Sequence, residues 1–250
     1  RAVGPELAGC ELSFVPRTPI DLGRAMAQHE AYCEALVVAG CEVLALPALP
    51  DHPDAVFVED TALVFDEVAV LTRPGAESRR GEVASIAAAL APHRSLLRIE
   101  APGTLDGGDV LRVGRDVFVG RSARSNSAGI AQLATLLAPH GYRVQGVATR
   151  DCLHLKSAAT VVADDTLLVQ PAWVDPAVFA GCTLIEVDPA EQHAANALRI
   201  GDTVIQPDCF PRTRARLEAA GIRVLPVDVS ELQKAEGAVT CCSLVLGVRA

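Results

Sequence analysis

Residues 59–71 read EDTALVFDEVAVL, and this stretch decides the fold because its pattern returns along the chain. Polar residues lead through small residues into an apolar run, a short polar turn and a second apolar run. The polar start recurs, and the steps between the second residues of each pair, here called the anchor residues, are 49, 48, 39 and 46. A nearly constant period of about 20–50 residues is typical of repeat architectures. The five pairs are Glu59-Asp60, Gly108-Asp109, Lys156-Ser157, Ala195-Asn196 and Cys241-Cys242.

The residues after each anchor residue predict the repeating unit. In the first four copies a second strand-like run comes after a short polar turn, which is typical of a hairpin. Apolar residues at helical spacing come next in residues 80–90, 126–137 and 212–220, and an earlier helix is expected over 25–39. A further strand is expected at 42–46, 96–99, 143–147 and 223–227, whereas residues 171–195 are atypical, with a short or absent helix.

Five units of hairpin, helix and strand in 250 residues predict one α/β domain over residues 1–250, built as a closed five-bladed α/β propeller of ββαβ repeats. The second strand of the last unit is expected from the start of the chain. A doubly wound sheet is the alternative, and it is disfavoured because adjacent hairpins require antiparallel pairs, which a purely parallel sheet lacks. Repeats closed around an axis bring the same position of every copy to one place.

The charge balance limits the kinds of partner. Twenty-two basic and 31 acidic residues give a net charge of −9, which argues against nucleic acid or an anionic membrane and favours a small cationic ligand. No stretch approaches about 18 uninterrupted apolar residues, so no membrane span is expected, and the first residues lack the organisation of a signal peptide. The eight cysteines lack metal-finger spacing, and we expect free thiols in a reducing compartment, the cytoplasm.

Chemistry-bearing residues occupy two repeat positions. A cysteine nucleophile, a histidine acid/base and a carboxylate that orients the histidine form a recognised catalytic combination. Taken alone, each residue also fits a structural role, because a lone cysteine is usually a small buried hydrophobe. The pair Glu59-Asp60 sits inside an apolar segment and needs a partner such as a bound cation. The position three before the anchor holds Phe57, Asp106, His154, His193 and Val239, and the position one before it holds Glu59, Gly108, Lys156, Ala195 and Cys241.

Six short words, in order along the chain, resemble the dimethylarginine dimethylaminohydrolase family. They are PDAVFVED (53–60), TRPGAESRR (72–80), TLDGGD (104–109), VGRSARSN (119–126), LHLKS (153–157) and VTCCS (239–243). Each word alone is a weak match, whereas the ordered set is specific. The resemblance implies the pentein fold of the guanidine-modifying superfamily, a five-bladed α/β propeller, which agrees with the repeat count found independently.

The resemblance also implies roles for individual residues. Cys241 is implied as the nucleophile on the guanidinium carbon of methylated arginine, His154 as the acid/base, and Asp106 as the residue that orients His154. Glu59 and Asp60 are implied to hold the guanidinium, with Asp54 nearby; Arg79 and Arg124 to hold the substrate carboxylate; and Ala235 to bind through its backbone. The products are citrulline and dimethylamine or methylamine, through a covalent thiouronium intermediate, and no metal or organic cofactor is implied. A homodimer is one assembly that the sequence allows.

Departures from the family pattern leave alternatives open. Residues 14–19 run almost directly into 20–24, so the lid that many relatives carry is expected to be missing or very short. Ser125 stands where threonine is usual and Glu236 where aspartate is usual, and His193 is the rival base. Arginine deiminase-like hydrolysis is the nearest alternative activity, and a ribosome-binding translation factor of the same fold is the alternative without catalysis.

Overall fold

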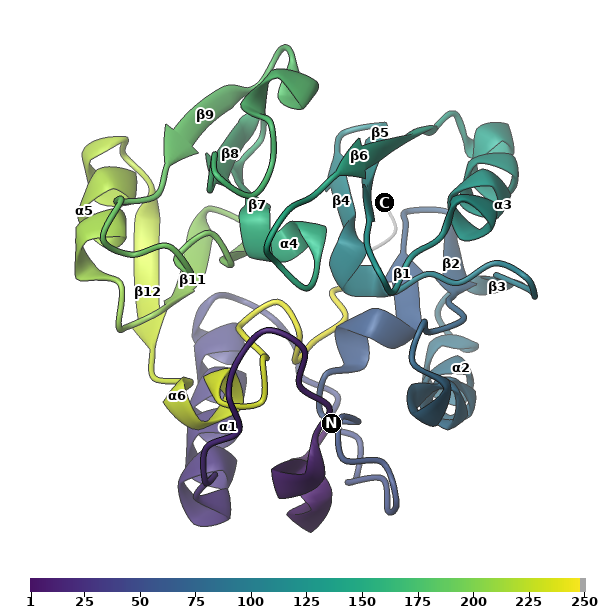
Figure 1. The fold of residues 1–250 in the computed structure, drawn as a ribbon, viewed down its shortest axis with the longest axis horizontal. Coiled ribbons are helices and arrows are strands. Elements are labelled where there is room, and N and C mark those ends of the chain that lie inside the picture. The colour runs from purple at the N-terminus through teal and green to yellow at the C-terminus, as the bar shows by residue number, and fades with distance from the viewer. Residues whose placement is uncertain (248–250) are drawn as a thin grey trace.

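The computed structural model describes residues 1–247 and contains four small sheets arranged around a centre (Figure 1). Each sheet has three strands, in the order of the sequence. The first sheet comprises β1 (Ala62–Val64), β2 (Val68–Leu71) and β3 (Ser95–Arg98), and the second β4 (Val110–Val113), β5 (Asp116–Arg121) and β6 (Arg143–Ala148). The third comprises β7 (Ala159–Ala163), β8 (Thr166–Val169) and β9 (Thr183–Glu186), and the fourth β10 (Leu198–Ile200), β11 (Thr203–Pro207) and β12 (Arg223–Val227).

Every sheet repeats one topology. The first two strands form an antiparallel hairpin, as in the pairing of Ala62 with Leu71, and the third strand runs parallel to the second, as in the pairing of Val70 with Leu97. The other three sheets pair in the same way. The predicted hairpins are therefore confirmed and the doubly wound sheet is excluded.

Helices connect the second and third strands of three sheets: α2 (Val83–Leu90), α3 (Ser127–Leu137) and α5 (Pro211–Ala219). The third sheet has only a 3-10 turn, Pro176–Phe179, which confirms the predicted short helix, although its strand β9 was not predicted. Helix α1 (Leu22–Val38) begins where the Asp21 carboxylate accepts the Arg24 N–H and caps it. The remaining short helices are α4 (Leu155–Ala158), α6 (Ser230–Gln233) and 3-10 turns at Pro5–Gly9, Val58–Thr61, Glu77–Glu82, Gly107–Asp109 and Ala138–His140.

The fifth copy differs from the others. Within residues 1–247 it carries no strand, so the strand predicted at 42–46 is wrong: the Ala2 N–H donates to the Leu46 carbonyl at 2.8 Å, but no ladder forms around this bond. The start of the chain lies beside residue 46 but forms no strand within residues 1–247, so the second strand expected there for the last unit is not observed. Four sheets are observed, and the fifth blade stays a prediction. The predicted domain end, Ala250, lies outside the described residues.

Hydrogen bonds at the anchor regions join each copy to the next and the last copy to the first. These bonds place the polar starts of all five copies together at the centre, so the closure predicted from the repeats is observed there. They run from Gly108 to Asp60, from Leu155 to Asp109, from Thr160 to Ala195, from Thr240 to Asn196 and from Glu59 to Cys241. None of the helices within residues 1–247 is long and apolar enough to cross a bilayer.

Candidate active site

A cavity at the centre contains eight of the nine residues predicted for the site. These eight come from segments far apart in the sequence, and the closure of the copies brings them together. The lining residues are Glu11, Asp54, Phe57, Asp60, Arg79, Asp106, Arg124, Leu153, His154, Ala235, Glu236, Gly237 and Cys241. Glu59 is the predicted residue that is missing from this lining.

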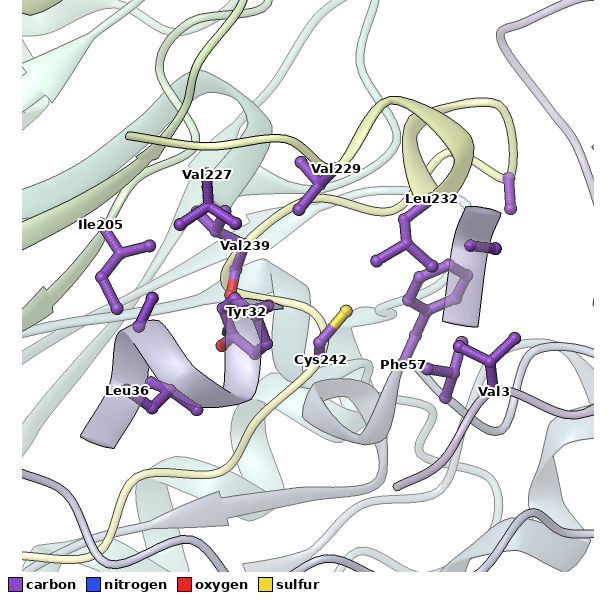
Figure 2. Packing of buried hydrophobic residues seen from close by; sticks show 14 of the residues in the cluster. Val3, Tyr32, Leu36, Phe57, Ile205, Val227, Val229, Leu232, Val239 and Cys242 are labelled. Atoms are coloured by element: carbon purple, nitrogen blue, oxygen red, sulfur yellow. Dashed lines mark hydrogen bonds between the residues drawn. The ribbon is translucent and has the colours of Figure 1, made fainter. Parts of the chain in front are cut away.

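The two adjacent cysteines face different surroundings. Cys242 is buried, and its side chain points into the apolar cluster around Tyr32 and Phe57 (Figure 2). The Tyr32 hydroxyl donates to the Val239 carbonyl at 2.7 Å and lies 2.7 Å from the Ser243 hydroxyl, which fixes the chain on both sides of the pair. Cys241 is consequently the cysteine that reaches the cavity, as the resemblance implied.

The Cys241 thiol is half-buried and lies among carboxylates. Its sulfur accepts the Ala238 N–H at 3.4 Å. Burial, followed by the negative charges of Glu59 and Asp60, raises the pKa of this thiol well above its ordinary value. The empty site therefore favours the neutral thiol over the nucleophilic thiolate.

The His154 imidazole is held in a group of three acids. Its Nε2 lies 3.2 Å from Asp106 Oδ2 and 3.9 Å from Asp60 Oδ1. Burial alone would lower the pKa of His154, but the charges of Asp60, Asp106 and Asp109 outweigh it and raise the pKa to about 9. A proton on this imidazole is thus retained at neutral pH, which suits a group that must donate it.

Glycine makes the approach of the imidazole possible. A Cβ atom at Gly108 would lie 2.5 Å from His154 Nδ1 and 2.9 Å from Asp60 Oδ1. Both separations are far below ordinary van der Waals contact, so a side chain at this position would push the imidazole aside. The close approach of His154 and Asp60 is therefore the physical reason for a glycine at position 108, the second glycine of TLDGGD.

Asp106 is fixed from two sides. Its Oδ1 accepts the Gly75 N–H at 2.8 Å, and its own N–H donates to the Ser125 hydroxyl at 3.1 Å. The side chain is fully buried. The carboxylate is therefore directed at His154 by its neighbours, and a serine at 125 supplies the hydroxyl needed.

Arg79 is a buried ion-pair partner rather than a free cationic fork. Its NH1 contacts Asp60 Oδ2 at 2.5 Å, its NH2 contacts Glu82 Oε2 at 2.9 Å, and it also donates to the Phe57 carbonyl at 2.8 Å. His154 and Arg79 outweigh the effect of burial and hold the pKa of Asp60 at about 2. Arg79 lines the cavity, and its predicted role in holding a substrate carboxylate stays a prediction.

Glu59 does not line this cavity, and its carboxylate has partners in two other copies. The Lys156 ammonium lies 2.6 Å from Glu59 Oε1, and the Thr240 hydroxyl donates to Oε2 at 2.8 Å. These three residues line a second cavity, formed by the first strands of the repeats. The paired carboxylates of the EDTALV word do have cationic partners, but those partners are Lys156 and Arg79 instead of a bound cation.

A loop lies where the sequence predicted a missing or very short lid. Glu11 in this loop lines the cavity and contacts the Arg124 guanidinium at 3.4 Å, and its N–H donates to Asp54 Oδ2 at 3.1 Å. Glu236 fastens the loop, since its carboxylate accepts the backbone N–H groups of Ser13, Phe14 and Val15. The chain crosses the front of the molecule at this point (Figure 1). The loop is short but present.

Two further positions bear on the site. His193, the rival base, is exposed and packs on the Trp173 ring at 5.0 Å between centroids, so it lies outside the cavity. Asp109, which sequence reasoning missed as a site residue, is fully buried beside His154. Its signal in the sequence is the anchor position that it shares with Asp60. The ligand atoms of Asp60, Asp106 and His154 lie within 4.8 Å of one another and could hold a metal ion.

Comparison with known proteins places this site in context. A family model for arginine deiminase matches residues 48–197. The N(G),N(G)-dimethylarginine dimethylaminohydrolase of Streptomyces coelicolor is 41% identical over 248 residues, which cover 98% of this chain and 95% of that protein. The enzyme of the same name from Pseudomonas aeruginosa is 38% identical over 226 residues, covering 90% of this chain and 89% of that protein.

Solved structures show the same fold. A cysteine-to-serine variant of the dimethylarginine dimethylaminohydrolase from Pseudomonas aeruginosa, complexed with citrulline, matches with a TM-score of 0.91 at 36% identity and covers 95% of this chain and 94% of that one. The N-terminal domain of ArgZ, a cyanobacterial arginine dihydrolase, matches with a TM-score of 0.81 at 24% identity over 90% of this chain and 86% of that one. The pentein fold class predicted from the sequence is confirmed.

Proposed function

The chain belongs to the dimethylarginine dimethylaminohydrolase family and hydrolyses methylated arginine, and on that premise we propose that the reaction passes through a covalent thiouronium intermediate on Cys241. The observation that carries the proposal is the cavity that Cys241 shares with the His154–Asp106 pair. The substrates are asymmetric dimethylarginine and monomethylarginine. The products are citrulline with dimethylamine or methylamine.

In the first half of the reaction the Cys241 thiolate attacks the guanidinium carbon. A C–S bond forms and the bond from that carbon to the methylated nitrogen breaks, while His154 gives its proton to the departing amine. The pKa of about 9 for His154 supports this acid role, because the imidazole is protonated before the substrate arrives. Asp106, at 3.2 Å, stabilises the imidazolium.

In the second half a water molecule replaces the amine. His154, now neutral, takes a proton from the water as the oxygen attacks the thiouronium carbon. The C–S bond then breaks and the sulfur leaves as the thiolate, while the remaining hydroxyl proton passes to solvent, where the released amine can take it up, and the carbonyl of citrulline forms. The imidazole is protonated again, so the cycle closes without an external acid.

Substrate contacts are assigned to groups that line the cavity. Asp60 holds the guanidinium at the reacting end, and Asp54 offers a second carboxylate nearby. Arg124 is a cationic fork for the substrate carboxylate, because its ion pair with Glu11 is partly exposed and can exchange. Ala235 contributes from the backbone. Arg79 lines the same cavity and, although it is ion-paired with Asp60, stays the second arginine proposed for the substrate carboxylate.

The positive charge of the substrate favours ionisation of the neutral Cys241 thiol. A guanidinium bound beside Asp60 offsets the negative charge that raises the pKa of Cys241. Binding therefore promotes ionisation of the thiol at the moment when the electrophile is in place. Desolvation of the cavity strengthens this effect, since charges interact more strongly away from water.

The test is incubation with asymmetric dimethylarginine, monomethylarginine and arginine, followed by assays for citrulline, the amine and ammonia. We expect citrulline from the two methylated substrates, loss of activity in Cys241→Ser, and full activity in the matched control Cys209→Ser, whose thiol is exposed and outside the cavity. Citrulline from none of the three compounds, or undiminished activity of Cys241→Ser, contradicts the assignment. Ammonia release from arginine as the only reaction selects arginine deiminase-like hydrolysis instead.

We also propose a cellular location and a class of binding partner for the protein. All eight cysteines are unpaired, which supports a cytoplasmic location because disulfides are rare in reducing compartments. The net charge of −9 supports a small cationic substrate as the partner. Organisation as one domain and assembly as a homodimer stay predictions.

A further inference from the structure

Two anchor residues without a role in the reaction are each bonded to a residue that is adjacent in sequence to a reacting group. Asn196, in the fourth copy, is buried and contacts Thr240, which directly precedes Cys241. Asp109, in the second copy, contacts Leu155, which directly follows His154. Each contact crosses a junction between copies, so the anchor residue ties one copy to the reacting segment of another.

The Asn196 amide grips Thr240 at two points. Its Oδ1 accepts the Thr240 N–H at 3.1 Å, and its Nδ2 donates to the Thr240 hydroxyl at 2.9 Å and to the Lys156 carbonyl at 3.2 Å. The Thr240 hydroxyl in turn donates its only proton to Glu59 Oε2 and lies 3.9 Å from the Cys241 sulfur. The direction of each of these hydrogen bonds is thereby set, so the Thr240 hydroxyl can only act as an acceptor toward the Cys241 thiol.

These hydrogen bonds between Asn196 and Thr240 matter because the segment around the nucleophile Cys241 has no strand or helix of its own. Residues 237–243 follow α6 as turns, so no ladder of backbone bonds fixes them. The amide of Asn196 satisfies a buried backbone donor there that would otherwise be unpaired. The position of the sulfur consequently depends on a side chain from another copy.

Asp109 does the same for the acid/base. Its Oδ1 accepts the Leu155 N–H at 3.1 Å, and its Oδ2 accepts the hydroxyls of Ser122 at 2.6 Å and Ser125 at 2.7 Å. Ser125 also receives the Asp106 N–H. The fully buried Asp109 carboxylate therefore touches the chain next to His154 and, through one serine, the chain at Asp106.

We propose that Asn196 and Asp109 are positioning residues for the reaction, Asn196 for the sulfur of Cys241 and Asp109 for the imidazole of His154 and the carboxylate of Asp106. This inference rests on the proposed function, which assigns the roles of those three groups. Neither positioning residue lines the cavity, so neither touches the substrate. Both act by holding a reacting group within the small positional tolerance that catalysis allows.

The test uses Asn196→Ala and Asp109→Asn, with Ser157→Ala as the matched control. Ser157 is the anchor residue of the third copy, is half-buried, and makes no cross-copy side-chain bond within residues 1–247. We expect each positioning variant to lower kcat about 10- to 100-fold, with KM changed less than about threefold because the substrate contacts remain. Ser157→Ala keeps kcat within about twofold.

Two readouts separate positioning from loss of folding. Thr240→Ser keeps the hydroxyl, and its kcat is expected to stay near that of the parent. Thr240→Val loses the hydroxyl, and its kcat is expected to fall as in Asn196→Ala. If Asn196→Ala does not fold, this pair of variants tests the positioning role in its place. For Asp109→Asn the readout is the alkaline limb of the plot of kcat against pH, which reports loss of the His154 proton. The charged or titratable groups that face His154 are Asp60, Asp106, Asp109 and Cys241; removal of the Asp109 charge is expected to move the limb down by about 1 pH unit.

The outcomes are distinct from those that test the proposed function. If the parent yields citrulline and Cys241→Ser does not, the proposed function stands and only the positioning roles are at stake. Kcat within twofold of the parent in both positioning variants overturns the inference, as does a KM that rises in proportion to the loss. An alkaline limb that does not move in Asp109→Asn overturns the part that concerns His154.

Discussion

Replacement of Gly108 by alanine is the sharpest test of how the site is packed. The added Cβ would lie 2.5 Å from His154 Nδ1 and 2.9 Å from Asp60 Oδ1, whereas an ordinary contact begins near 3.4 Å. The imidazole must therefore retreat by about 1 Å, and a displacement of that size in a catalytic group can cost about 100-fold in rate. The overpacking also costs about 1–3 kcal/mol of unfolding free energy.

The assay is initial-rate release of citrulline from asymmetric dimethylarginine, together with thermal unfolding. We expect kcat to fall by about two orders of magnitude because the added methyl group lies against His154, and KM to rise because it also lies against Asp60. Gly23→Ala is the control, since a Cβ at that position in α1 meets only the Asp21 carboxylate at 3.4 Å. Activity within threefold of the parent in a folded Gly108→Ala protein refutes the argument.

Three further predictions come from the charges of the site. Arg79→Met removes the buried arginine that pairs with both Asp60 and Glu82 and should lower the unfolding free energy of the substrate-free protein by about 3–5 kcal/mol. The pKa of His154 is raised from 6.5 to about 9 in the folded protein, so its stabilising contribution, about 3 kcal/mol, is fully present below pH 6.5 and is lost as the pH rises through 9. Alkylation of Cys241 by a neutral reagent should be slow near pH 7.5 in the empty protein and faster with guanidinium ion present.

Each of these has its own control. Arg80→Met removes an ion pair with the exposed Glu77 and should cost under about 1 kcal/mol; an equal loss in both arginine variants contradicts the buried-pair argument. His154→Gln should reduce the pH dependence of stability between 6.5 and 9, and a parent whose stability is flat there contradicts the assigned shift. A thiol that already ionises below about pH 8 in the empty protein rules out promotion by the substrate.

Local sequence was sufficient for the units of the fold. Apolar runs such as Val68–Leu71 form strands, and polar turns such as Asp66-Glu67 close hairpins, because both depend on residues next to each other in the chain. The strand predicted at 42–46 is wrong for the converse reason: a strand needs a partner, and among residues 1–247 a single backbone bond, from Ala2 to Leu46, joins this segment to the start of the chain. The strand β9 was not predicted because only a short 3-10 turn, and no full helix, precedes it in the chain.

The sequence by itself determined the repeat, its period and the short set of polar positions from which the site is drawn. Tertiary structure alone decided which members of that set meet. His154 and His193 occupy the same repeat position, yet one lies against Asp106 and the other against Trp173. Glu59 and Asp60 are neighbours in sequence, yet Lys156 binds one and Arg79 the other. The physical reason is that a buried charge is directed by its closest opposite charge, and those partners come from other copies of the repeat.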